Sequence, residues 1–149
     1  MKFVGNKIWS HLIKLNNHMC IFCKIASGEV AAYKVYEDND ILAFLDAKPV
    51  NLGHTLVITK KHYQNLEEIP EEDLKTLIVA VKKIGNLLKT KLGIEGYNVS
   101  MNNDPVAGQI IPHIHFHVIP RHADDGHHLW SQKEYAPGEE EEIIKKLIS

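Results

Sequence analysis

The chain has 149 residues, of which 44% are hydrophobic and 24% are charged, and its formal net charge is −2 when histidine is neutral. This length and composition are typical of one globular domain with a substantial core, and a charge so close to zero argues against a broad nucleic-acid-binding surface. No apolar run is long enough to cross a bilayer, so we expect neither a membrane nor a nucleic acid among the partners.

The N-terminal segment, residues 1–18, differs in composition from the rest of the chain. It carries lysines but no acidic residue, and Ile8, Leu12 and Leu15 could share one face of a short helix. It has no apolar region of the secretory type, and its lack of arginine weakens an interpretation as an organelle presequence. We interpret it as a non-essential extension before one domain over residues 19–149, and expect the chain to fold and act without it.

Two cysteines, Cys20 and Cys23, stand at the start of this domain. A single C-x-x-C pair is weak evidence by itself, because a redox pair, half of a metal site and a coincidence all share this spacing. Nothing in the sequence indicates a secreted disulfide framework. We therefore expect a reducing, cytoplasmic compartment.

Hydrophobic periodicity predicts a short helix and three strands in the first part of the domain. The pattern indicates a helix or turn from Cys20 to Ser27, which Gly28 ends. Alternating and apolar runs then predict strands at residues 33–37, 41–45 and 55–59.

A long helix, a fourth strand and a final helix are predicted after that. Acidic residues behind Pro70 mark the first turn of the long helix, and Gly93 suits its end. The apolar stripe of this helix consists of Leu74, Leu77, Ile78, Val81, Ile84 and Leu88. A strand is expected at 97–101, an irregular polar segment at 124–138 and a helix at 139–148. Hairpin-linked strands with one long helix predict an α+β fold around an antiparallel sheet of about five strands.

The most informative segment is residues 108–121, where histidines alternate with apolar residues. Pro112 and Pro120 bracket this run, as expected where a strand begins and ends. The histidines are His113, His115 and His117, and the residues expected on the opposite face are Ile114, Phe116 and Val118. Because a strand points alternate side chains to opposite faces, the imidazoles would line one face and the apolar residues would face the core. A histidine-rich metal-binding tract is the alternative, but such tracts are usually polar loops.

The run from His113 to His117, preceded by Gly108 and Gln109, resembles the histidine triad motif of the HIT superfamily. The resemblance extends from Met19 to about Arg121, and more loosely to the end of the chain. It implies a HIT domain over residues 19–149, with a fold of the predicted kind. It also implies a homodimer in which the two central sheets join.

The resemblance implies covalent nucleotidyl transfer at the triad. His115 corresponds to the nucleophile, which attacks the α-phosphorus before water releases the nucleoside monophosphate. His117 would contact phosphate oxygens and donate a proton, and His54 would lie near the triad. The implied substrate is a nucleoside phosphoramidate or related adenylate, bound as a purine nucleotide such as AMP.

The resemblance also assigns a nucleotide pocket. Asp46 would accept hydrogen bonds from both ribose hydroxyls, although aspartate is also an ordinary turn residue. Asn102 would contact the phosphate, and Gln109 would help to position the phosphate and the leaving group. The nucleobase would lie among residues that are each typical of an ordinary core: Ile21, Phe22, Ile25, Phe44 and Leu45. Ile110 replaces a Ser or Thr of some relatives, which leaves substrate preference and turnover open.

Zinc-bearing members of the family imply a second use for the C-x-x-C pair. Their metal ligands correspond to Cys20, Cys23, His62 and His113, a set of the nitrogen and sulfur donors that tetrahedral zinc prefers. The site would be closed and structural. The alternative for His62 is a solvated histidine in a basic turn.

Several functions remain open from the sequence. Besides hydrolysis of a phosphoramidate or adenylate, the chain could cleave dinucleoside polyphosphates or act as a nucleotide-binding regulatory protein with little turnover. Metal storage by the ten histidines is less favoured. We interpret His122, His127 and His128 as surface residues. Trp130 either caps the active site, packs near a dimer partner or packs against the sheet.

Overall fold

The computed structural model describes residues 20–149, so the predicted extension and its short helix lie outside the described residues. The elements follow the order α2 (Ile21–Ser27), β1 (Lys34–Glu37), β2 (Ile41–Leu45), β3 (Thr55–Thr59), α3 (Glu71–Leu92), β4 (Gly96–Ser100), the 3-10 turn η1 (Pro105–Ala107), β5 (His115–Arg121) and α4 (Glu139–Ile148). Within these residues, no helix is long and apolar enough to span a bilayer.

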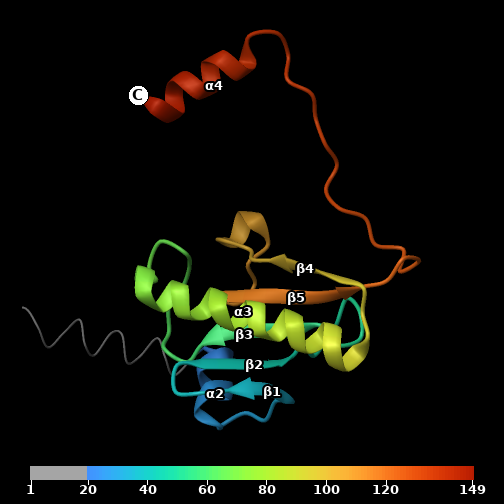
Figure 1. The fold of residues 1–149 in the computed structure, drawn as a ribbon. Coiled ribbons are helices and arrows are strands. Elements are labelled where there is room, and N and C mark those ends of the chain that lie inside the picture. Colours follow the sequence, from blue (N-terminus) through green and yellow to red (C-terminus); the bar gives the residue numbers. More distant parts are fainter. Residues whose placement is uncertain (1–19) are drawn as a thin grey trace, which may run out of the picture.

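The strands form one antiparallel sheet in the order β1-β2-β3-β5-β4. The histidine-rich strand β5 is therefore central, between β3 and β4. Helix α3 crosses one face of the sheet, and the short helix α2 lies against the other (Figure 1). This arrangement confirms the predicted α+β class with its five-stranded antiparallel sheet.

Two hydrophobic cores form because β2 and β3 send alternate side chains to the two faces of the sheet. Ile41, Ala43 and Val57 pack in the core beneath α3. On the face of α2, the strands contribute Leu42, Phe44, Leu56 and Ile58, which pack with Phe22 and Ile25. Strands covered on both faces explain why residues 41–45 and 55–59 are apolar runs rather than simple alternations.

Helix α3 begins after Pro70 and ends at Gly93, as the sequence predicted. Its buried stripe differs from the prediction at Ile78, which is 44% exposed. Ile78 lies about 100° around the helix axis from Leu77, at the edge of the face that meets the sheet. Ala80 and Gly85 are buried in its place.

The histidine-rich segment is only partly a strand, which corrects the expectation that Pro112 and Pro120 bracket it. Strand β5 begins at His115, and His113 lies in the bend before it. Pairing with β3 ends at Val118, so Pro120 has only β4 beside it and is tolerated inside the strand.

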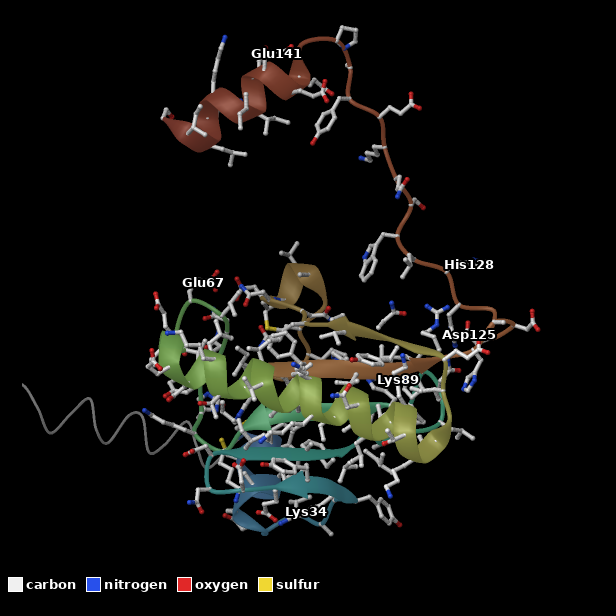
Figure 2. All side chains as sticks on the ribbon, in the orientation of Figure 1. Lys34, Glu67, Lys89, Asp125, His128 and Glu141 are labelled. Atoms are coloured by element: carbon white, nitrogen blue, oxygen red, sulfur yellow. The ribbon has the colours of Figure 1, made fainter. Side chains whose placement is uncertain are left out.

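The C-terminal segment leaves the body of the molecule after His127, which still contacts Arg121 and Val50. It runs as an irregular stretch to α4, which stands apart from the sheet (Figure 1). The side chains of α4, among them Glu141, also lie away from the body (Figure 2), and all of its residues are exposed. The irregular segment and the last helix occur where the sequence placed them.

Candidate active site

A cavity of about 1040 Å³ opens on the face of the sheet that carries α2. One side of it is apolar and is formed by Ile21, Phe22, Ile25, Phe44 and Leu45. The polar side carries Asp46, Asn102, His115 and His117. A large apolar cleft with a few convergent polar groups is the usual form of a small-molecule site. The structure thus brings together most of the residues that the sequence assigned to a nucleotide pocket.

His115 is the buried imidazole of this cavity, with 6% exposure. Its Nδ1 lies 2.7 Å from the carbonyl oxygen of His113, so Nδ1 carries the proton and donates it. Nε2 therefore has the lone pair. Burial lowers the pKa of His115 below its ordinary value of about 6.5, which keeps the ring neutral at pH 7. A neutral imidazole with an unprotonated Nε2 is a competent nucleophile.

His54 and His117 form a hydrogen-bonded pair of imidazoles beside His115. The backbone N–H of Val50 donates to His54 Nδ1 at 3.2 Å, so the neutral ring carries its proton on Nε2. That Nε2 lies 2.9 Å from His117 Nδ1 and donates to it. His117 in turn presents an Nε2–H group. Burial, with the neighbouring His115 and His54 rings, lowers the pKa of His117 to about 4.

Asp46 follows β2 and is held at one oxygen. Oδ1 accepts from the backbone N–H of Lys48 at 2.8 Å, while Oδ2 lies 3.7 Å from His54 Nε2. The carboxylate therefore keeps acceptor capacity toward the cavity. Lys48 also lines the cavity and was missed by the sequence analysis. Its position two residues after Asp46 was the available signal.

The loop before β5 contains three of the predicted or questioned positions. Asn102 lines the cavity and donates from Nδ2 to the carbonyl of Gly108 at 3.2 Å. Ile110, which replaces a hydroxyl residue, also lines the cavity and is 87% exposed. An apolar side chain thus stands at the cavity where the resemblance would place a polar contact.

Gln109 is buried and does not line the cavity. Its Nε2 donates to the carbonyls of Gln64 at 2.6 Å and Ile111 at 3.1 Å, and its Oε1 accepts from the N–H of Asp104 at 2.9 Å. Its amide is therefore engaged in fixing the loop. This geometry differs from the expected direct contact with a phosphate, and favours positioning of the loop that carries Asn102.

A cluster of two thiols and two imidazoles lies beside the cavity. It joins Cys20 and Cys23 at the start of α2, His62 in the loop after β3 and His113 in the bend before β5, and the donor atoms of the four lie within 4.8 Å of one another. His113 donates from Nε2 to the carbonyl of Thr59 at 2.8 Å, so its Nδ1 lone pair faces the cluster. His62 is half-buried in this cluster, unlike the solvated alternative.

The spacing within the cluster fits a tetrahedral ion. Ligands about 2.0–2.1 Å (N) and 2.3 Å (S) from zinc would be separated by about 3.3 Å between nitrogens and about 3.6 Å between nitrogen and sulfur. The two Nδ1 atoms of His62 and His113 are 3.2 Å apart. The nitrogen–sulfur distances are 3.3 Å and 3.5 Å.

The thiols themselves are electrostatically unequal. Burial raises the pKa of both, but contacts with His113 and His62 outweigh it and lower the pKa of Cys20. The resulting charge on Cys20 adds to burial in raising the pKa of Cys23. One cation at the centre would favour the thiolate form of both residues.

Known proteins carry the same domain. The HIT domain family model matches residues 27–124. An uncharacterised HIT-like protein of Methanocaldococcus jannaschii is 56% identical over 108 residues, which are 72% of this chain and 83% of its own length. An adenosine 5'-monophosphoramidase of Candida albicans is 42% identical over 107 residues, covering 68% of this chain and 70% of its own. A zinc-bound histidine triad family protein of Mycobacterium smegmatis has a solved structure with a TM-score of 0.71 at 36% identity, covering 74% of this chain and 80% of its own. The chain belongs to the HIT family.

Proposed function

We propose that the protein hydrolyses a nucleoside phosphoramidate or related adenylate at the α-phosphate, through a nucleotidyl intermediate on His115. The observation that carries this proposal is the ring orientation of His115. Its Nδ1 is anchored at 2.7 Å on the carbonyl of His113, and its Nε2 is left unprotonated in a cavity of about 1040 Å³. The relative from C. albicans, named an adenosine 5'-monophosphoramidase, supports the substrate class.

In the first step the Nε2 lone pair of His115 attacks the α-phosphorus. The new N–P bond forms as the bond to the leaving group breaks, and the leaving group takes the bonding electrons and a proton from the solvent, which the second step returns. The Nε2–H of His117 donates a hydrogen bond to a phosphate oxygen, where negative charge develops. The carbonyl of His113 stabilises the positive charge on the His115 ring through the Nδ1–H bond.

In the second step water replaces His115 at phosphorus. The water oxygen forms the new bond, the N–P bond returns its electrons to Nε2, and the nucleoside monophosphate and a proton are released. Because the imidazole is a good leaving group while it is cationic, two moderate barriers replace one high barrier. Asp46 would hold the ribose hydroxyls, and the apolar side of the cavity would hold a purine base.

Zinc fits the cluster of Cys20, Cys23, His62 and His113, and we propose it as a structural ion. Its distances and donor types support zinc, as does the zinc-bound relative of M. smegmatis. The ion would tie α2, which forms one wall of the cavity, to the bend before β5. It would not take part in the chemical steps.

A homodimer and a cytoplasmic location are further parts of the proposal. Strand β4 is an edge strand of the described sheet and carries Val99, which is 43% exposed, so it offers an edge for a second copy. Cys20 and Cys23 are thiols rather than a disulfide, which suits a reducing compartment. The absence of nucleic-acid partners also stays a prediction.

Substitution of His115 tests the function. His115→Ala should lower kcat by at least about 10⁴-fold, because a covalent route without its nucleophile has no substitute. The matched control is His128→Ala, which removes an exposed histidine and should keep wild-type kcat. Rapid quenching of the wild type with a slow adenosine phosphoramidate should yield a peptide containing His115 with the added mass of one AMP. Normal turnover by His115→Ala would refute the assignment.

The dinucleoside polyphosphate alternative shares the same cavity and nucleophile. Parallel kinetics with an adenosine phosphoramidate and a diadenosine polyphosphate separate the two substrate classes. A higher kcat/KM for the phosphoramidate is expected. Binding of AMP without turnover of either compound would instead favour the regulatory, nucleotide-binding role.

A further inference from the structure

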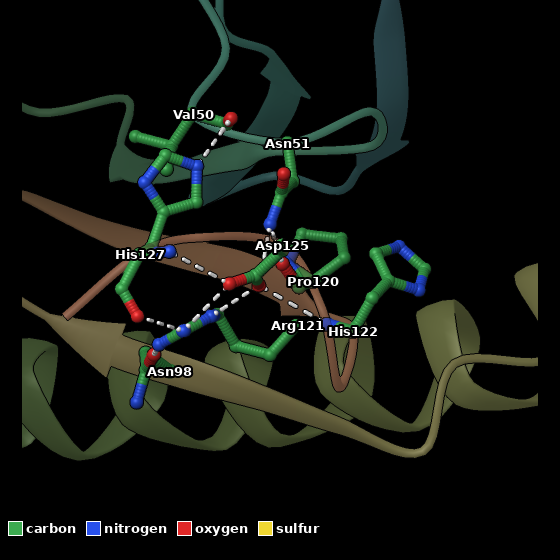
Figure 3. A network of polar contacts seen from close by, with 8 residues as sticks. All are labelled: Val50, Asn51, Asn98, Pro120, Arg121, His122, Asp125 and His127. Atoms are coloured by element: carbon green, nitrogen blue, oxygen red, sulfur yellow. Dashed lines mark hydrogen bonds and ion pairs between the residues drawn. The ribbon is translucent and has the colours of Figure 1, made fainter.

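A polar network follows the histidine-rich strand on the side away from the thiol cluster. Arg121, the last residue of β5, makes a bidentate pair with Asp125, with distances of 2.6 Å from Nε to Oδ2 and 2.9 Å from Nη2 to Oδ1. Its Nη1 donates to Asn98 of β4 at 2.7 Å, and its Nη2 donates to the carbonyl of His127 at 2.8 Å. Figure 3 shows this guanidinium surrounded by its partners.

Asp125 is the centre of the network. Besides the guanidinium, it accepts from the backbone N–H groups of His122 and His127 at 3.1 Å and 3.0 Å and from Asn51 Nδ2 at 3.0 Å. Its side chain is only 5% exposed. An isolated buried carboxylate would be costly, so this degree of satisfaction marks a built structure rather than a chance surface ion pair.

The network holds the loop between β2 and β3 at two points. Asn51 Nδ2 donates both to Asp125 and to the carbonyl of Pro120, the latter at 2.9 Å. Close by, His127 Nε2 donates to the carbonyl of Val50 at 3.2 Å. In Figure 3 the side chains of Asn51 and Asp125 meet between this loop and β5, with His127 reaching Val50.

The held loop carries the donor that sets the tautomer of His54. The N–H of Val50 can only donate, so its contact at 3.2 Å requires a lone pair on His54 Nδ1 and a proton on Nε2. That proton is donated to His117 Nδ1 at 2.9 Å, which leaves His117 with its Nε2–H directed away from the pair. If Val50 moved, His54 could carry its proton on Nδ1, and His117 could then present a lone pair where a donor is needed.

We propose that Arg121 and Asp125 are positioning residues for the active site. Through Asn51 and His127 they hold the Val50 peptide in place. The Val50 peptide in turn fixes His54 and His117 in the tautomers that present a hydrogen-bond donor to the substrate. The effect on catalysis rests on the function proposed above. The effect on the two imidazole tautomers does not. None of the four side chains that hold the Val50 peptide lines the cavity: Asn51, Arg121, Asp125 and His127.

The principal test compares two neighbouring aspartates. Asp125→Asn removes the charge at the centre of the network, and Asp124→Asn makes the same change at an exposed position one residue away. Asp125→Asn should lower kcat between about tenfold and a hundredfold, because small displacements of a positioned group have effects of that size. KM should change by less than about twofold, since the apolar wall is untouched. Asp124→Asn should match the wild type.

Proton–nitrogen NMR correlations of the histidine rings supply a readout that general loss of structure would not mimic. In the wild type, His54 should show a proton on Nε2 only. In Asp125→Asn it should show a mixture of both tautomers, while His115 keeps its proton on Nδ1, where the carbonyl of His113 holds it.

A surface variant keeps the test informative if Asp125→Asn fails to fold. His127→Ala removes the contact with Val50 but retains the backbone contacts, and His128→Ala is its exposed control. His127→Ala should shift His54 in the same direction, and His127→Gln, whose side chain can still donate, should restore the wild-type spectrum. An unchanged His54 tautomer in both Asp125→Asn and His127→Ala, or an equal loss of kcat in Asp124→Asn, would overturn the proposal. Absence of turnover in the wild type would refute the proposed function, but the NMR result would still decide the positioning role.

Discussion

His113 and His115 are two residues apart and face the same side of the sheet, but the structure gives them opposite ring orientations. His113 donates from Nε2 to Thr59 and leaves its Nδ1 lone pair for the thiol cluster. His115 donates from Nδ1 to the carbonyl of His113 and leaves its Nε2 lone pair for the cavity. In both cases a backbone carbonyl selects the tautomer. The position of a carbonyl therefore decides whether an imidazole is suited to hold an ion or to attack a substrate.

The surroundings of the two rings differ in the same sense. His113 has no exposed surface and its open nitrogen meets two sulfur atoms and a second imidazole. His115 opens to a cavity, and its neighbours His54 and His117 are already joined by an N–H···N hydrogen bond of 2.9 Å. A closed donor set is suited to a structural ion, whereas an open lone pair beside a hydrogen-bond donor is suited to chemistry on a ligand.

Removal of a thiol from the closed cluster should have the largest effect on stability. Protein purified without chelator should contain one zinc per chain, and Cys20→Ser should lose it. An ion that binds only the folded state at a thousand times its Kd adds about 4 kcal/mol to the free energy of unfolding. Metal analysis and the melting temperature check this expectation. Activity should also fall, although indirectly, because the carbonyl that anchors His115 belongs to His113, one of the four residues of the cluster.

Chelation provides the control for this prediction. A chelator should lower the melting temperature of the wild type but leave that of Cys20→Ser unchanged. A zinc-free wild type together with an unchanged melting temperature in Cys20→Ser would refute the metal site. The nucleophile assignment would stand, because the chemical steps do not involve the ion.

Asp46 tests the cavity rather than the thiol cluster, because it shows whether the cavity binds a ribose. If Asp46 binds both ribose hydroxyls, a 2'-deoxyribonucleotide should bind more weakly than the ribonucleotide by about 1.5–3 kcal/mol, the usual value of a hydrogen bond to a charged group. Calorimetric titration measures the difference. Asp46→Asn should reduce it, whereas Asp40→Asn, at the other end of β2, should not. Equal affinities for the two ligands in the wild type would remove Asp46 from the site.

Much of the fold could be predicted because the local signals agree with one another. Strands β2 and β3 and helix α4 have the predicted bounds, and β4 begins one residue before its prediction. The prediction that Ile78 is buried was wrong, because periodicity defines the centre of an apolar helix face better than its edges. The predicted start of the histidine-rich strand was wrong, because the alternation of residue types continues through His113. The backbone bends at His113, and this bend places the His113 ring in the thiol cluster.

The site was predictable only as far as residue type carries the chemistry. The family motif led to His115 and to the cluster ligands, but Gln109 donates to Gln64, which lies far away in the sequence. His127 looked like a surface residue, and it does lie at the surface, but its ring contacts Val50. Contacts between distant loops decide such roles, and no local pattern records them.

The response to acid should be the most gradual effect, and it concerns the imidazoles at the cavity, His54, His115 and His117, rather than the thiol cluster. Burial, together with the rings of His115 and His54, lowers the pKa of His117 to about 4 in the folded protein, against about 6.5 in an unfolded chain. Between these values the unfolded chain binds a proton that the folded protein does not. The free energy of unfolding should therefore fall as the pH is lowered through this range, by at most about 1.4 kcal/mol per pH unit for one proton.

Substitution of His117 isolates this contribution from that of the thiol cluster, which also loses an ion in acid. Urea unfolding of the wild type, His117→Asn and His128→Asn between about pH 4.5 and 7 gives the three slopes. The stability of His117→Asn should be less sensitive to acid than that of the wild type. The surface variant His128→Asn should match the wild type. Because all three proteins keep the thiol cluster, its acid response is common to them and cancels in the differences. If the free energy of unfolding of His117→Asn fell with pH as steeply as that of the wild type, the folded protein would accept the proton. The surroundings of His117 would then not hold its ring neutral.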